Sequence, residues 1–239
     1  MALSDPWGLT LLVGFFGLFS LMVSWMIDQE RRKSRKNSTQ AAAFGFQPVN
    51  DPSPALVKQI LSLHTVSNEH PLEVRNIYHK RTLEANLYLF DLWDPGGAHA
   101  VLLAESAVAV FLLPAVTIPR ISLIPRLDGW EQGQGFKGAW PLSRMVTGLQ
   151  MLAFSDCPEF NRRFFAAGLE ESAARAFLTA DLRRQLARLD RFHIEAAGGV
   201  ITLSEMEPRN CGEAERAERI KNQITTGVTL ARWLSVAEH

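Results

Sequence analysis

Residues 192–203 read FHIEAAGGVITL, and this stretch decides the fold. Strand-forming residues lie on both sides of Gly198-Gly199, and two glycines between such runs predict a β-hairpin. Before the hairpin, Glu170–Leu189 places apolar residues at helical spacing between arginines, which predicts one amphipathic helix. After it, we expect a final helix from about Glu213 to Leu234.

The earlier part of the chain adds strands and one helix. The run Asn50–Pro54 is a turn and helix-start signal, and apolar residues recur after it at near-helical spacing. Val74–Trp93 shows the alternation of strands. We expect further strands or extended chain at 100–105, 107–113, 121–124 and 161–166. The whole order predicts one mostly antiparallel α+β domain over residues 44–239.

Composition excludes some classes of partner and site. The 239 residues carry 25 Lys and Arg against 25 Asp and Glu, and this balance gives no support to a nucleic-acid partner. The two cysteines, Cys157 and Cys211, match no zinc or redox spacing. We expect both to be small buried apolar residues.

A membrane anchor is predicted at residues 7–27, which read WGLTLLVGFFGLFSLMVSWMI without a charge. A helix of about 20 such residues spans the hydrocarbon core of a bilayer. Trp7 and Trp25 would lie at the two interfaces, with Phe15 and Phe16 in the lipid. A cleaved signal peptide fits less well, because the leader MALSDP carries no basic residue.

The flanks of this segment predict its orientation. A basic connector, residues 28–43, follows the span directly. Its cations are Arg31, Arg32, Lys33, Arg35 and Lys36. The positive-inside rule then predicts a single-pass protein of the inner (cytoplasmic) membrane, with the N-terminus outside and the domain in the cytosol. The cations either contact anionic lipid or only fix the topology.

A second apolar run, Val101–Ile118, is an alternative span. It contains Glu105, which is costly in a bilayer, and Pro114, which disrupts a helix. Two buried strands therefore explain the run better than a second helix in lipid.

Several short motifs in the last third of the chain carry a family resemblance: Phe154-Ser155, Phe160-Asn161-Arg162-Arg163-Phe164, Gly168, a helix through Phe177-Leu178-Thr179 and the hairpin that begins Phe192-His193-Ile194-Glu195. In these motifs the chain resembles DUF3137, an uncharacterised bacterial family. Phe44-Gly45-Phe46 and Leu89-Phe90-Asp91 extend the resemblance over about residues 44–236. It implies an anchored α+β domain and gives no catalytic residues.

One glycine-rich loop formally matches a dinucleotide motif. Residues 133–138 read GQGFKG, but Trp140-Pro141 follows at once and no helical period begins there. A dinucleotide site needs a helix N-terminus at this point to bind the pyrophosphate. We therefore expect a surface loop over 129–138, in which Trp130, Phe136 and Trp140 are available to contact a partner or the membrane.

Few other residues suggest chemistry. His193 and Glu195 share one face of a strand and would form either an acid–base couple or a partly exposed pair. Asp91 and Asp94 bracket Trp93, and the second is better explained as a turn residue. No histidine has a second ligand at metal spacing, so we expect no catalytic, cofactor-binding or metal-binding residues.

These observations predict a membrane-anchored, non-enzymatic interaction protein, an accessory or structural subunit of a larger membrane complex. The bilayer and other membrane subunits would be its partners. One alternative is a domain that binds a lipid surface or a small ligand through the basic juxtamembrane segment and the arginines in and around Glu170–Leu189. The other is an unrecognised enzyme that uses Asp91, His193 or Glu195.

Overall fold

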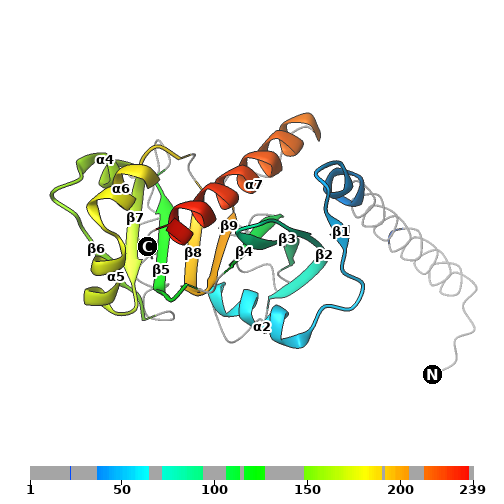
Figure 1. Ribbon diagram of the computed structural model, residues 1–239, viewed down its shortest axis with the longest axis horizontal. Helices are drawn as coiled ribbons and strands as arrows, with labels where there is room; N and C mark the ends of the chain where they lie inside the picture. The colour runs from blue at the N-terminus through cyan, green and yellow to red at the C-terminus, as the bar shows by residue number, and fades with distance from the viewer. Residues whose placement is uncertain are drawn as a thin grey trace, which may run out of the picture.

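The computed structural model describes Met22 and residues 37–64, 72–93, 106–113, 116–126, 148–189, 192–204 and 213–236. Nine strands within these ranges form one sheet in the order β1-β2-β3-β4-β9-β8-β5-β7-β6. They are β1 (Gln47–Pro48), β2 (Glu73–Arg81), β3 (Ala85–Trp93), β4 (Ala107–Leu112), β5 (Ile118–Pro125), β6 (Gln150–Leu152), β7 (Phe164–Gly168), β8 (His193–Gly198) and β9 (Val200–Ser204). Each of these neighbouring pairs is antiparallel, which confirms the predicted α+β class (Figure 1).

Helices cover both faces of the sheet. Residues 37–43 are helical, and the longer elements are α2 (Pro54–Leu63), α4 (Pro158–Arg163), α5 (Glu171–Phe177), α6 (Ala180–Leu186) and α7 (Glu213–Val236). The larger core contains residues of α4 to α7 and of helix 37–43, and the smaller core contains residues of α2. We call the corresponding sides of the sheet the α7 face and the α2 face.

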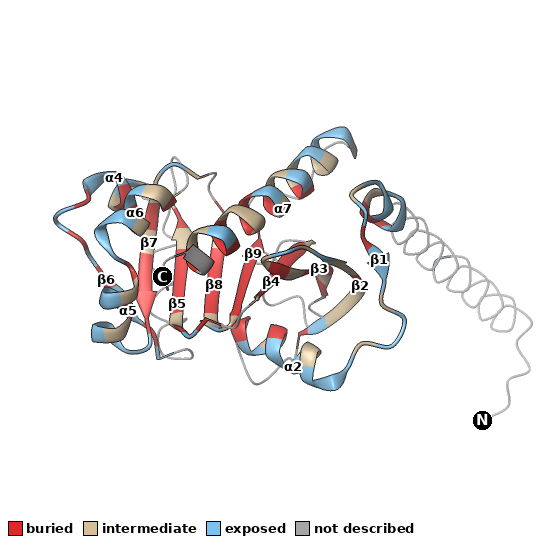
Figure 2. Ribbon diagram, viewed as in Figure 1, coloured by how far each residue is buried: buried red, intermediate tan, exposed pale blue. Residues whose placement is uncertain are grey.

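Alternation along the strands assigns side chains to these two faces. In β9, Ile201 and Leu203 belong to the larger core, while Val200 belongs to the smaller one. Successive side chains of a strand point to opposite faces, so Thr202 lies on the α2 face with Val200. Figure 2 shows that the central strands are buried almost throughout.

The hairpin of β8 and β9 lies in the middle of the sheet. β4 and β5 are consecutive in the chain, but β9 pairs with β4 and β8 pairs with β5, so the hairpin separates them. The sequence predicts the hairpin itself, and Gly198 at φ 58 makes its turn. Its position between two earlier strands is not encoded in any local pattern.

Helix α7 crosses the α7 face over β4 and β9 (Figure 1). Gly227 permits its close approach, because a Cβ atom at this position would lie 2.8 Å from Cγ2 of Val110 in β4. The predicted final helix is confirmed, and so is the helix that follows Ser53, whose side chain accepts a hydrogen bond from Leu56 N at 3.2 Å.

Two sequence predictions in the third quarter of the chain are wrong. The single helix expected over Glu170–Leu189 is broken at Leu178 into α5 and α6. Thr179 begins the second helix, since its hydroxyl accepts a hydrogen bond from Leu182 N. The chain expected to be extended over 161–166 is helical to Arg163, because Pro158 starts α4, and only Phe164 begins a strand.

No helix among the described residues is both long enough and apolar enough to cross a membrane. The predicted span at 7–27 lies outside them, apart from Met22. The strand expected at 100–105 and the glycine-rich loop 129–138 lie outside them as well.

Candidate functional site

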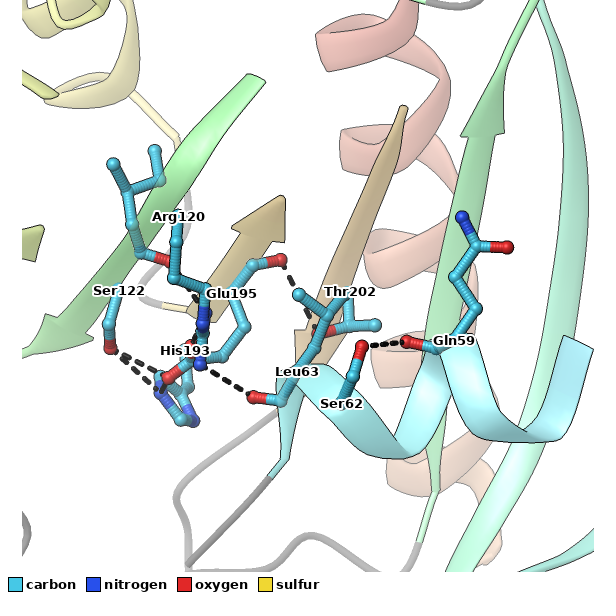
Figure 3. Close-up of polar contacts among 9 residues, drawn as sticks. Gln59, Ser62, Leu63, Arg120, Ser122, His193, Glu195 and Thr202 are labelled. Carbon is cyan, nitrogen blue, oxygen red and sulfur yellow. Dashed lines mark hydrogen bonds and ion pairs between the residues drawn. The ribbon is translucent and has the colours of Figure 1, made fainter. Parts of the chain in front are cut away.

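A buried polar cluster occupies the α2 face where β5, β8 and the end of α2 meet (Figure 3). Ser122 of β5 and Glu195 of β8 are register partners, so their side chains lie on the same face. His193 precedes Glu195 by two residues and shares this face. Arg120 of β5 and the C-terminal end of α2 complete the cluster, which we call the Glu195 cluster.

The Glu195 carboxylate is the acceptor at its centre. Ser122 Oγ donates to Oε1 at 2.7 Å, and His193 Nε2 lies 2.8 Å from the same oxygen. Arg120 Nη1 donates to the other oxygen, Oε2. Arg120 Nη2 donates to the main-chain carbonyl of Leu63 at 2.9 Å. Through this guanidinium, the carboxylate is linked to the last turn of α2.

These contacts keep the carboxylate ionised. Burial raises the pKa of the Glu195 carboxyl and is the largest single effect. Four effects lower the pKa instead. They are the hydrogen bond and the charge of His193, the charge of Arg120, and the hydrogen bond from Ser122. Together they outweigh burial, so the pKa lies below its usual value.

His64 caps the C-terminus of α2 beside this cluster, and its ring is 5% exposed. Burial lowers the pKa of His64 to about 4; the charge of Glu195 opposes this shift, and the charges of His193 and Arg120 add to it. The imidazole is therefore neutral near pH 7. Its Nε2 atom has no hydrogen-bond partner within the part of the chain that the structure describes.

The Glu195 cluster does not have the geometry of a hydrolase triad. In such a triad, the carboxylate and the serine contact different nitrogens of the histidine. Here His193 Nε2 lies 2.8 Å from the carboxylate and 3.5 Å from Ser122 Oγ. A nitrogen this close to an ionised carboxylate carries the proton and cannot accept another from Ser122. The Ser122 side chain is also only 1% exposed, so it presents no nucleophile.

Asp91 belongs to a separate cluster on the α7 face. It follows Leu89 by two residues in β3 and therefore shares the face of Leu89, which lies in the larger core, whereas Glu195 lies on the α2 face. Asn37 and Asn76 donate to Asp91 Oδ2 at 2.7 and 2.8 Å, and Ser106 donates to Oδ1 at 2.8 Å. The structure therefore does not bring Asp91 together with the His193 and Glu195 pair.

The arginines near Glu170–Leu189 are largely paired with acids. Arg175 bonds Glu171 at 2.7 Å, and Arg184 bonds Asp181 at 2.5 Å. Arg162 lies 3.7 Å from Glu159, and Arg183 is paired with Asp156. These four pairs offset part of the local positive charge that the sequence suggested as a ligand-binding feature, while Arg188 is exposed and has no ion pair among the described residues.

The residues that carry the family resemblance have structural roles. The side-chain amide of Asn161 bonds both main-chain groups of Phe154. It donates to the carbonyl at 2.5 Å and accepts from the N–H at 3.3 Å. Arg183 and Arg175 lie over the Phe154 ring, with guanidinium carbons 4.2 and 5.3 Å from the centroid. This arrangement fixes α4, α5 and α6 against the chain that follows β6.

The other predicted site residues lie outside the described ranges. They are Trp7, Phe15, Phe16, Trp25, Arg31, Arg32, Lys33, Arg35, Lys36, Trp130, Phe136 and Trp140. Among the described residues, no group of three His, Cys, Asp or Glu side chains is placed to hold a metal ion. Cys157 is a free, buried thiol, as expected.

Sequence reasoning identified His193 and Glu195 but missed Arg120, Ser122 and His64. The i, i+2 spacing in one strand was a usable signal for the first two. Arg120 and Ser122 are brought in by pairing between strands that lie far apart in the sequence, and His64 by the packing of the end of α2 beside them, and no local pattern reports either.

No family model and no curated protein matches this chain. The resemblance to DUF3137 therefore stays a prediction. Among solved structures, the crystal structure of the mycobacterial trehalose monomycolate transport factor A, TtfA, is similar, with a TM-score of 0.48 and 12% sequence identity. The match covers 82% of this chain and 93% of that chain. At this TM-score and identity, the likeness carries no argument about function.

Proposed function

We propose that this protein is a membrane-anchored interaction protein without enzymatic activity, an accessory subunit of a larger membrane complex. The observation that carries the proposal is the docking of helix 37–43, the end of the predicted connector, on the domain. A docked connector gives the domain a defined position at the end of its tether, as a subunit that positions other proteins needs.

The docking contacts combine apolar burial with polar bonds. Ala41 is 0% exposed within the larger core, and Phe46 just after the helix is also buried there. Asn37 donates to Asp91, and Lys80 Nζ donates to the carbonyl of Phe44 at 2.7 Å. The connector therefore belongs to the same body as the sheet, from Asn37 onward.

The two alternative functions have less support. An enzyme using Asp91, His193 and Glu195 would need them to converge in one pocket, and the first lies on the other face of the sheet from the second and third. Binding of anionic lipid by α4 to α6 would need arginines whose charge is not already balanced, and four of them are paired with acids. The basic juxtamembrane residues that this alternative also uses lie outside the described ranges.

The test is purification of the full-length protein from its native host in a mild detergent, with quantitative mass spectrometry of co-eluting proteins. We expect a stoichiometric membrane-protein partner. Replacing Asn37 by Ala should weaken its recovery about tenfold, because helix 37–43 then loses its hydrogen bond to Asp91 and docks less firmly. Ala43→Gln, an exposed change in the same helix, is the matched control. A clean monomer without any co-eluting protein would contradict the proposal.

A further inference from the structure

An open hollow of about 510 Å³ lies where β5 begins and β7 ends, beside α5. Most of its lining is apolar: Pro119, Leu169, Ala173 and Phe177. Leu169 is 49% exposed, which leaves a large apolar side chain in water. Covering such surface is favourable by about 25 cal/mol per Å², so this concave apolar patch is suited to receive an apolar group.

The rim of the hollow carries one charge that is available to a ligand. Arg120 lines the hollow, but its guanidinium points into the Glu195 cluster, where the carboxylate neutralises it (Figure 3). Glu170 also lines the hollow and is exposed, and the structure gives it no ion pair among the described residues. Its neighbour Glu171 differs, because it is paired with Arg175.

We propose that this hollow is the docking site for another protein, which presents a large apolar side chain next to a Lys or Arg. The inference rests on the proposed function and names the surface that performs it. The apolar lining requires an apolar anchor residue. The uncompensated Glu170 favours a positive neighbour and disfavours an anionic lipid surface. The volume is large enough to admit an aromatic or aliphatic side chain with little rearrangement.

The experiment is site-specific photo-crosslinking in the full-length protein, expressed in its native host. Leu169 is replaced by p-benzoylphenylalanine in one strain. Leu83, which is 94% exposed at the turn between β2 and β3, is replaced in another. We expect a discrete adduct with a different protein at position 169, whose crosslinked peptide contains an apolar residue beside a Lys or Arg.

Charge reversal tests the role of Glu170 in the same strain. Glu170→Lys should reduce the adduct about tenfold, the effect of losing one interfacial charge pair. Glu159→Lys is the matched control, because Glu159 is exposed on α4 and makes only a long pair with Arg162. The melting temperatures of both variants report that the fold is intact.

Several outcomes would overturn the inference. An adduct with lipid, an adduct with a second copy of this chain, or an adduct insensitive to Glu170→Lys would each assign the hollow to something else. Adducts at position 83 but none at 169 would place the interaction elsewhere and leave the proposed function standing. Failure of the proposed function itself would appear separately, as the absence of any co-purifying partner.

Discussion

At the scale of single residues, the main feature is a carboxylate held ionised inside the sheet. Glu195 receives bonds from Ser122, His193 and Arg120, so its negative charge is matched at both oxygens. Removing one member of such a buried set leaves the others uncompensated and is expected to cost several kcal/mol. His64 has the opposite arrangement, because its imidazole is buried in the neutral form without a partner for Nε2 in the described structure.

His64 gives a prediction about acid stability. Its pKa is about 4 in the folded protein and 6.5 when unperturbed. Between these values the unfolded chain binds one proton more than the folded protein does. Stability should therefore fall by about 1.4 kcal/mol per pH unit as the pH drops from 6.5 toward 4. His64→Gln should flatten this slope, as measured by urea unfolding of the full-length protein in mild detergent.

The pH window and a control separate this effect from others. The pKa of Glu195 is lowered from 4.5, so its stabilising contribution is lost only below about that pH, and measurements between pH 4.5 and 6.5 report mainly His64. Leu61→Ala removes partly buried apolar surface from the same helix and should lower stability equally at every pH. An unchanged slope in His64→Gln would show that another group is responsible.

At the scale of elements, close packing decides where α7 lies. The helix approaches β4 at Gly227, where the side chain of Val110 fills the space that a Cβ atom would need. Glycine inside a helix costs up to about 1 kcal/mol relative to alanine. Gly227 therefore lowers the intrinsic stability of the helix but allows it to pack closely against β4.

A double-mutant cycle tests this packing. Gly227→Ala should lower the melting temperature, because overpacking costs about 1 to 3 kcal/mol and exceeds the gain in helix propensity. In a Val110→Ala background, where the obstructing methyl groups are absent, the same substitution should become neutral or stabilising. If Gly227→Ala is stabilising in the wild-type background, α7 does not pack as closely as described.

The elements also show what a sequence can and cannot predict. The β8–β9 hairpin, α2 and α7 follow from local signals: two glycines, a serine cap and a sustained helical period. The break between α5 and α6 does not follow from such a signal, because the cap at Thr179 lies inside a continuous apolar pattern. Of the Glu195 cluster, the sequence predicts only His193 and Glu195, which lie in one strand. Ser122 and Arg120 join them through pairing between strands that are distant in the sequence.

At the scale of the whole molecule, Asp91 joins segments from both ends of the domain. It accepts from Asn37 of the N-terminal helix, and Ser106, which also bonds it, accepts from Arg216 of α7 at 2.8 Å. Asn76, which donates to the same carboxylate, has a φ of 50°, a conformation uncommon outside glycine. One carboxylate thus couples the connector, a bulge in β2 and the last helix.

Asp91→Ala should destabilise the packing of helix 37–43 and of the start of α7 on the domain. Hydrogen exchange measured by mass spectrometry should become about tenfold faster in 37–43 and in 213–220, while β8 and β9 keep their protection. Asp181→Ala is the control, because Asp181 is an exposed acid whose one ion pair among the described residues is with Arg184 of its own helix. Faster exchange in 37–43 alone would show that the two ends are not coupled through Asp91.

The central position of the β8–β9 hairpin has a consequence for the protein's synthesis. The ribosome completes β4 and β5 long before it makes residues 193–204, which must enter between them. Until then, the nascent chain carries two unpaired strand edges rich in apolar residues, a state that favours aggregation. Early insertion of a hydrophobic N-terminal segment would hold each growing chain at the membrane, apart from its neighbours, during this interval. If residues 7–27 form the anchor that the sequence predicts, deleting them should lower the yield of folded protein, measured as the fraction that escapes aggregation on expression.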